Sequence, residues 1–159
     1  MRLVLMKSAT ILSLTVFVMA IINSYGQASQ PAYDEEVAKS LGADAYGMKG
    51  YVLAILKTGP TEIKDEETTT KLFRGHLENI SRLAEEGKLV VAGPLAKNDK
   101  EYRGIFIMNV PTVAEAEALV ETDPAIKAGV LPVELYGWYG SAALPVYLET
   151  HNKIEKHRP

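Results

Sequence analysis

The chain has 159 residues, 47% of them hydrophobic and 23% charged, with a net charge of −3. This length leaves room for one domain rather than two, and the mild acidity without a long basic run argues against a nucleic-acid partner. The absence of cysteine excludes disulfides, cysteine nucleophiles and thiolate metal sites, so the core alone must hold the domain together.

The N-terminus has the pattern of a secretory signal peptide. Arg2 and Lys7 flank the start of an almost uncharged apolar run over residues 8–22, and small and polar residues follow it. We therefore predict a signal peptide over residues 1–26 and an exported protein that has no membrane attachment after cleavage. The alternative is an uncleaved membrane anchor, although the run is shorter than the roughly 20 residues that span a bilayer.

The next elements are predicted from apolar spacing and from glycine and proline stops. A polar lead-in over residues 27–49 contains a short helix over 34–41, and a C-terminal extension covers 141–159. Between them we predict one domain over residues 50–140. Its expected elements are a strand over 50–57, a helix over 66–86, strands over 89–92 and 103–110, a helix over 112–121, a helical turn over 124–128 and a strand over 133–138.

The order strand-helix-strand-strand-helix-strand predicts an α+β, ferredoxin-like fold, in which both helices cover one face of a four-stranded antiparallel sheet. An apolar sheet face left bare is most often covered by a second copy of the chain. We therefore predict a homodimer packed sheet to sheet. Tyr136, Trp138 and Tyr139 on the last strand are interpreted as core or dimer interface rather than as a ligand site.

His76 is the first candidate for chemistry, because it lies on the apolar side of the first long helix, between Phe73 and Ile80. One interpretation is a buried histidine that a backbone carbonyl satisfies. The other is an acid or base whose pKa is tuned by its surroundings.

A catalytic base needs a partner that fixes its tautomer, and Asp123 is the natural candidate. Its other interpretation is an N-cap, because Asp before Pro124 is favourable at the start of a short helix. The two roles are compatible, since one carboxylate oxygen can cap the helix while the other accepts a hydrogen bond from the imidazole.

No cofactor site is expected from the sequence. It has no G-x-S-x-G, P-loop or G-x-G-x-x-G motif, and its three histidines lack metal-ligand spacing. His151 and His157 lie in the polar tail, where we expect them to be solvated.

Two segments carry a resemblance to a known family. The run from His76 to Leu95, which contains Ala-Glu-Glu-Gly-Lys-Leu-Val-Val-Ala-Gly-Pro-Leu, and the run Thr122-Asp-Pro-Ala-Ile-Lys-Ala-Gly-Val130 together resemble YCII-related (YciI-like) domains over residues 50–139. The lead-in and tail look like an exported bacterial branch, periplasmic or secreted.

The resemblance implies a dimeric α/β barrel with a pocket that holds a catalytic His–Asp pair, which corresponds to His76 and Asp123 here. A few similar proteins are dehydrochlorinases of chlorinated hydroxyquinols, and barrel relatives include lactone isomerases. The first hypothesis is therefore cofactor-free acid–base chemistry, of lyase or isomerase type, on a small organic molecule. The alternative is a non-catalytic small-ligand binder or a structural dimeric module, in which His76 and Asp123 only hold two helices together.

Overall fold

The structure, a computed structural model, describes residues 32–156. The predicted signal peptide and His157 lie outside the described residues. Residues from Glu35 onward form one compact unit. Within the described part of the chain, no helix has the length and apolar character needed to cross a bilayer.

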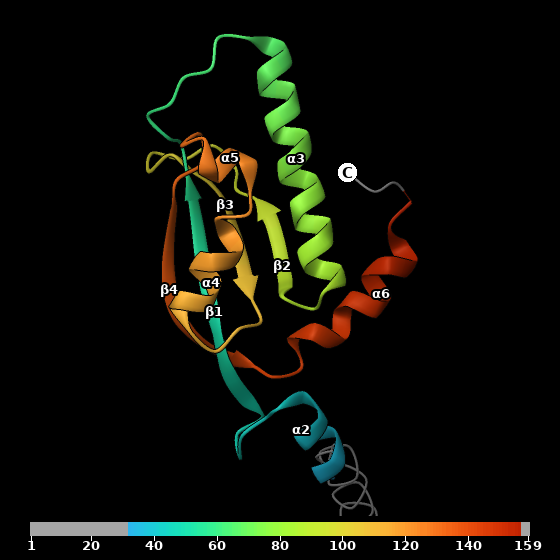
Figure 1. The fold of residues 1–159 in the computed structure, drawn as a ribbon. Coiled ribbons are helices and arrows are strands. Elements are labelled where there is room, and N and C mark those ends of the chain that lie inside the picture. Colours follow the sequence, from blue (N-terminus) through green and yellow to red (C-terminus); the bar gives the residue numbers. More distant parts are fainter. Residues whose placement is uncertain (1–31, 157–159) are drawn as a thin grey trace, which may run out of the picture. The chain divides into compact units, whose positions relative to one another are not determined.

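The predicted alternation of strands and helices is confirmed (Figure 1). In chain order the elements are α2 (Glu35–Leu41), β1 (Met48–Lys57), α3 (Glu66–Glu85), β2 (Leu89–Pro94), β3 (Tyr102–Met108), α4 (Val113–Val120), α5 (Pro124–Lys127), β4 (Val133–Ser141), the 3-10 turn η2 (Leu144–Val146) and α6 (Tyr147–Ile154).

Some boundaries differ from the sequence prediction. β1 and β4 are longer than expected because their pairing continues until Met48 lies opposite Ser141. β2 continues through Pro94. Proline is tolerated there because β2 is an edge strand, whose outward N–H groups have no partner in the sheet. In the C-terminal extension, where no helix was predicted, η2 and the helix α6 form.

The sheet has the strand order β2-β3-β1-β4, and every pair of neighbours is antiparallel. β1 and β2 therefore run parallel on either side of β3 and are joined by α3. In the same way, β3 and β4 run parallel on either side of β1 and are joined by α4 and α5. This is the ferredoxin-like α+β arrangement that the sequence predicted.

The core lies between the sheet and the helices α3, α4 and α5, which Figure 1 shows over one face. Alternate residues of the two central strands point into it, because side chains alternate across a strand. The buried side chains of this core include Val52, Ala54, Leu56, Leu83, Phe106, Met108, Ala116 and Val120.

The opposite face of the sheet carries apolar side chains that lie outside this core. They are only partly buried or exposed: Leu53, Ile55, Val91, Ile105, Ile107, Tyr136 and Trp138. The three aromatic residues of β4 do not form one cluster. Trp138 packs against Tyr51, with ring centroids 5.7 Å apart, whereas Tyr139 alternates away from it and donates a hydrogen bond to Asp44.

Candidate active site

His76 is buried in the third turn of α3, where two aromatic rings hold its imidazole. The ring of Phe106 on β3 stacks on the imidazole at a centroid distance of 6.0 Å, and the ring of Phe73 meets it edge to face at a centroid distance of 6.3 Å. α3 begins at its N-cap Asp65, which accepts a hydrogen bond from the N–H of Thr68. The apolar side of this helix faces the sheet and carries His76 into the protein.

Asp123 is fully buried and performs both of the roles that its sequence position allows. Its Oδ1 accepts hydrogen bonds from the N–H groups of Ala125 and Ile126, at 2.9 and 3.3 Å, and so caps α5. Its Oδ2 lies 2.6 Å from Nδ1 of His76. The structure therefore brings together the two residues that the sequence singled out, although 47 positions separate them.

Gly75 allows α3 and α5 to approach closely enough for His76 to contact Asp123. A Cβ at this position would lie 2.6 Å from Cγ of Pro124, the first residue of α5. Any larger residue would push α5 away, and Asp123 with it. The glycine next to His76 thus has a packing reason that the sequence prediction missed.

The electrostatics of the pair favour an ionised Asp123. Burial acts to raise the pKa of this carboxyl, but the hydrogen bond and attraction of His76, together with the N–H donors of Ala125 and Ile126, outweigh it and lower the pKa below 3.8. An ionised carboxylate only accepts hydrogen bonds, so Nδ1 of His76 carries the proton. In the neutral imidazole, Nε2 is then left with the lone pair and is the basic atom.

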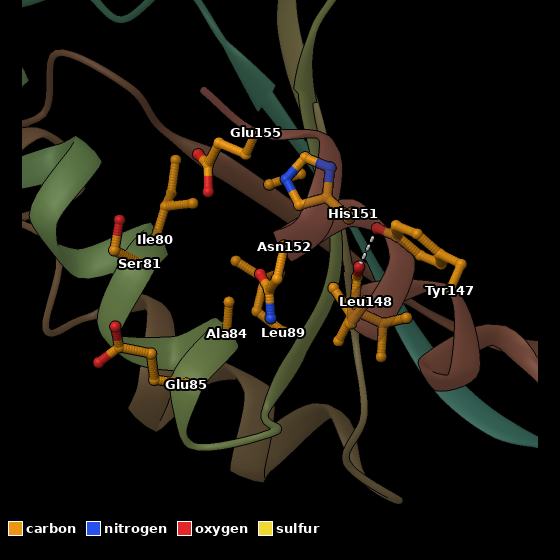
Figure 2. A pocket seen from close by; sticks show the side chains of 12 residues that line it. Ile80, Ser81, Ala84, Glu85, Leu89, Tyr147, Leu148, His151, Asn152 and Glu155 are labelled. Atoms are coloured by element: carbon orange, nitrogen blue, oxygen red, sulfur yellow. Dashed lines mark hydrogen bonds between the residues drawn. The ribbon is translucent and has the colours of Figure 1, made fainter. Parts of the chain in front are cut away.

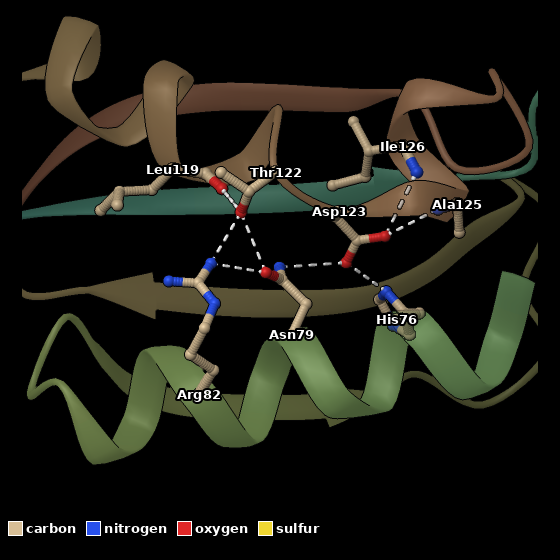
Figure 3. A network of polar contacts seen from close by, with 8 residues as sticks. All are labelled: His76, Asn79, Arg82, Leu119, Thr122, Asp123, Ala125 and Ile126. Atoms are coloured by element: carbon tan, nitrogen blue, oxygen red, sulfur yellow. Dashed lines mark hydrogen bonds and ion pairs between the residues drawn. The ribbon is translucent and has the colours of Figure 1, made fainter.

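A polar network continues from this pair along α3 (Figure 3). Asn79 places its Nδ2 3.5 Å from Oδ2 of Asp123, and its Oδ1 accepts a hydrogen bond from Arg82 at 2.7 Å. Arg82 also donates to Thr122 at 2.9 Å. The sequence analysis missed these residues; the signal was a polar side chain every third residue after His76, together with the threonine that precedes Asp123.

His76 also lines a cavity of about 420 Å³ between α3 and the strands β2 and β3. Arg103 is the only other lining residue with an ionisable side chain, and the remaining ones are apolar or glycine: Leu56, Phe73, Leu77, Ile80, Ala92, Gly93, Pro94, Gly104, Phe106 and Leu131. Among the described residues no buried side-chain nitrogen lacks a partner, and Nε2 of His76 has no hydrogen bond within the chain. Nε2 is thus accessible, and the cavity is the space that His76 faces.

His151 is exposed, as expected for the tail, but it lies on α6 with its ring against Tyr147. It takes no part in the network around His76. The described residues therefore offer one buried histidine with an ordered partner, and one at the surface.

Comparison with known proteins places His76 and Asp123 within the range of a known domain. Residues 48–138 match the family model of the YCII-related domain. No curated protein matches the chain. Among solved structures, a similar one is the 5-chloro-2-hydroxyhydroquinone dehydrochlorinase (TftG) from Burkholderia phenoliruptrix AC1100, in complex with 2,5-dihydroxybenzoquinone. It is 23% identical, with a TM-score of 0.39, and the match covers 55% of this chain and 92% of that one.

Proposed function

Since the chain belongs to the YCII-related domain family, we propose that it catalyses a proton transfer on a small organic molecule, with His76 as the acid and base. The observation that carries this proposal is that the two nitrogens of the His76 imidazole have different surroundings. Buried Asp123 holds Nδ1 at 2.6 Å, while the other nitrogen faces a cavity with mainly apolar walls. The cavity has the volume of a small-molecule site, which is typically about 300–1,000 Å³.

The chemistry follows from the arrangement of the two side chains. Nε2 takes a proton from the substrate, the imidazole becomes positively charged, and the carboxylate of Asp123 stabilises that charge through Nδ1–H. Asp123 is thus a positioning residue that acts through His76. The same imidazole can return the proton to another atom, which gives an isomerisation, or leave it in place while a leaving group departs, which gives an elimination.

The first prediction concerns His76→Asn, whose side-chain amide retains a donor for Asp123 but has no basic nitrogen. We expect the rate to fall by a factor of about 10² to 10⁴, the usual contribution of a positioned acid or base. The assay is a panel of small cyclic compounds with acidic C–H bonds, including 5-chloro-2-hydroxyhydroquinone and an unsaturated lactone. Proton NMR in D₂O reports exchange and isomerisation, and chloride release reports elimination.

Glu78→Ala is the matched control, because Glu78 is exposed on the same helix and does not line the cavity. Thermal unfolding of both variants separates a loss of chemistry from a loss of fold. A compound that His76→Asn turns over as fast as the wild type, with both proteins folded, would contradict the role of His76. Binding of a panel compound without turnover would favour the alternative of a non-catalytic binder.

We also propose that the protein is exported. We further propose that it forms a homodimer through the sheet face opposite the helices α3, α4 and α5. Support for the dimer comes from the partly buried Leu53, Ile55, Ile105 and Ile107 beside the exposed Trp138, an apolar surface that solvent disfavours. Support for export comes from the signal-peptide pattern at the N-terminus.

The second prediction tests the dimer with Leu53→Glu, which places a charge at the centre of that face. Light scattering should give twice the chain mass for the mature wild type at micromolar concentration and the single mass for the variant, because an unpaired buried charge is strongly unfavourable. Val113→Glu is the control, since Val113 is exposed on α4. A monomeric wild type would overturn the proposed dimer.

A further inference from the structure

A second hollow lies beside the His76 cavity, and part of its wall comes from outside the family domain. It has a volume of about 340 Å³ and lies between α3, β2 and α6 (Figure 2). Ile80 and Ala84 of α3 face Leu148 and His151 of α6 across it. The family match ends at residue 138, so α6 adds this wall to the domain.

Two residues connect this hollow with the His76 cavity. Ile80 and Ala92 line both, so the two spaces are adjacent along α3 and β2. Tyr147 holds α6 against the edge strand β2, because its hydroxyl donates a hydrogen bond to the carbonyl of Val90. No residue of α6 is buried, so the helix leaves the hollow between itself and α3 unfilled.

The side chains that line the His76 cavity differ from those that line the second hollow. Around His76 the walls include Phe73 and Phe106, which suit an aromatic ring, and the free Nε2 can accept a hydrogen bond from a hydroxyl on that ring. Beyond Ile80 the second hollow is lined by aliphatic side chains, including Ala84 and Leu148, and by the polar side chains of Ser81, Glu85, His151, Asn152 and Glu155. A ring with a hydroxyl fits the lining beside His76, and an alkyl chain would contact the aliphatic side chains of Ala84 and Leu148 beyond Ile80.

We propose that the substrate of the His76 site is a hydroxylated ring with an alkyl tail, and that α6 provides the wall against which the tail binds. The inference rests on the proposed function for its ring-binding half and adds the tail site. One helical turn from Ile80 to Ala84 rises about 6 Å, which corresponds to about five methylene groups. Ile80 then marks the boundary between the reacting ring and the tail.

The third prediction uses 4-n-alkylphenols, from 4-methylphenol to 4-hexylphenol, as probes of the full mature chain. Affinity, measured by calorimetry, should rise about fourfold for each added methylene, the usual effect of burying that group. Ala84→Trp fills the second hollow and should remove this rise while leaving the affinity for 4-methylphenol unchanged. Leu148→Trp does the same from α6 and serves if the first variant fails to fold.

Glu78→Trp is the control, because it adds the same ring to an exposed position of α3 outside both spaces. Binding of 4-methylphenol without a rise along the series would overturn the tail site but leave the ring site intact. A rise that both tryptophan variants preserve would also overturn it, since the tail would then bind elsewhere. Absence of binding by every phenol would overturn both the tail site and the ring site.

Discussion

Replacing Asp123 with asparagine is expected to reverse the tautomer of His76 and so to stop proton transfer while the fold persists. The oxygen that caps α5 stays an oxygen, and the oxygen that faces His76 becomes an NH₂ group. Because an amide nitrogen only donates, Nδ1 of His76 must then accept, and the proton moves to Nε2. The atom that faces the cavity is no longer a base.

The expected effect is large on catalysis and small on stability. Turnover of any compound found active with the wild type should fall by a factor of about 10² to 10⁴. The free energy of unfolding should fall by only about 1 kcal/mol, because the cap of α5 and the contact with His76 keep a partner and only the long contact from Nδ2 of Asn79 loses its acceptor. Long-range ¹H–¹⁵N NMR of the imidazole gives an independent readout, since it distinguishes a protonated Nδ1 from a protonated Nε2 without any substrate.

Asp65→Asn is the matched control, because Asp65 caps α3 in the same way but is exposed and has no histidine beside it. It should leave both the tautomer and turnover unchanged. If the protonated Nδ1 persists in Asp123→Asn, the carboxylate does not set the tautomer. Unchanged turnover with a reversed tautomer would instead remove Nε2 from the mechanism.

The sequence predicts the local elements around the site better than the contacts between them. Apolar alternation and glycine stops were sufficient to predict the strands and the helix α3, because each pattern reports on local structure. Asp123 was a candidate partner for His76 on residue chemistry, and the resemblance to YCII-related domains supported the pair, but no local pattern shows that positions so far apart are in contact. Their contact depends on the packing of α5 against α3 at Gly75, which is a tertiary feature.

Other parts of the site could not be read from the sequence for a related reason. Asn79 and Arg82 look like ordinary polar residues of a surface helix until Thr122 is placed opposite them. α6 was not predicted because a helix of eight residues with only Tyr147, Leu148 and Ile154 as large apolar residues gives a weak local signal. Its position is set instead by the hydrogen bond from Tyr147 to β2, a contact between distant parts of the chain.

Asp123→Ala is expected to be the most destabilising of these substitutions. It removes the cap of α5, which costs about 1 kcal/mol, and leaves the buried Nδ1–H of His76 without an acceptor, which costs about 1–3 kcal/mol. The total loss should be about 3 kcal/mol in urea unfolding at pH 7. Asp65→Ala is the matched control, because it removes an exposed cap alone and should cost about 1 kcal/mol.

Acid should remove this difference between wild type and Asp123→Ala. The folded pKa of Asp123 lies below its ordinary value of 3.8, so the ionised carboxylate binds its proton less readily when folded than when unfolded. Its contribution is therefore fully present above the unfolded pKa and is lost as the pH falls through the folded pKa. Unfolding measured between about pH 5 and pH 2 should show the gap between the two proteins narrowing steadily. A gap that stays constant down to pH 2 would mean that the charge of Asp123 does not stabilise the fold, and that its oxygens act only as neutral acceptors.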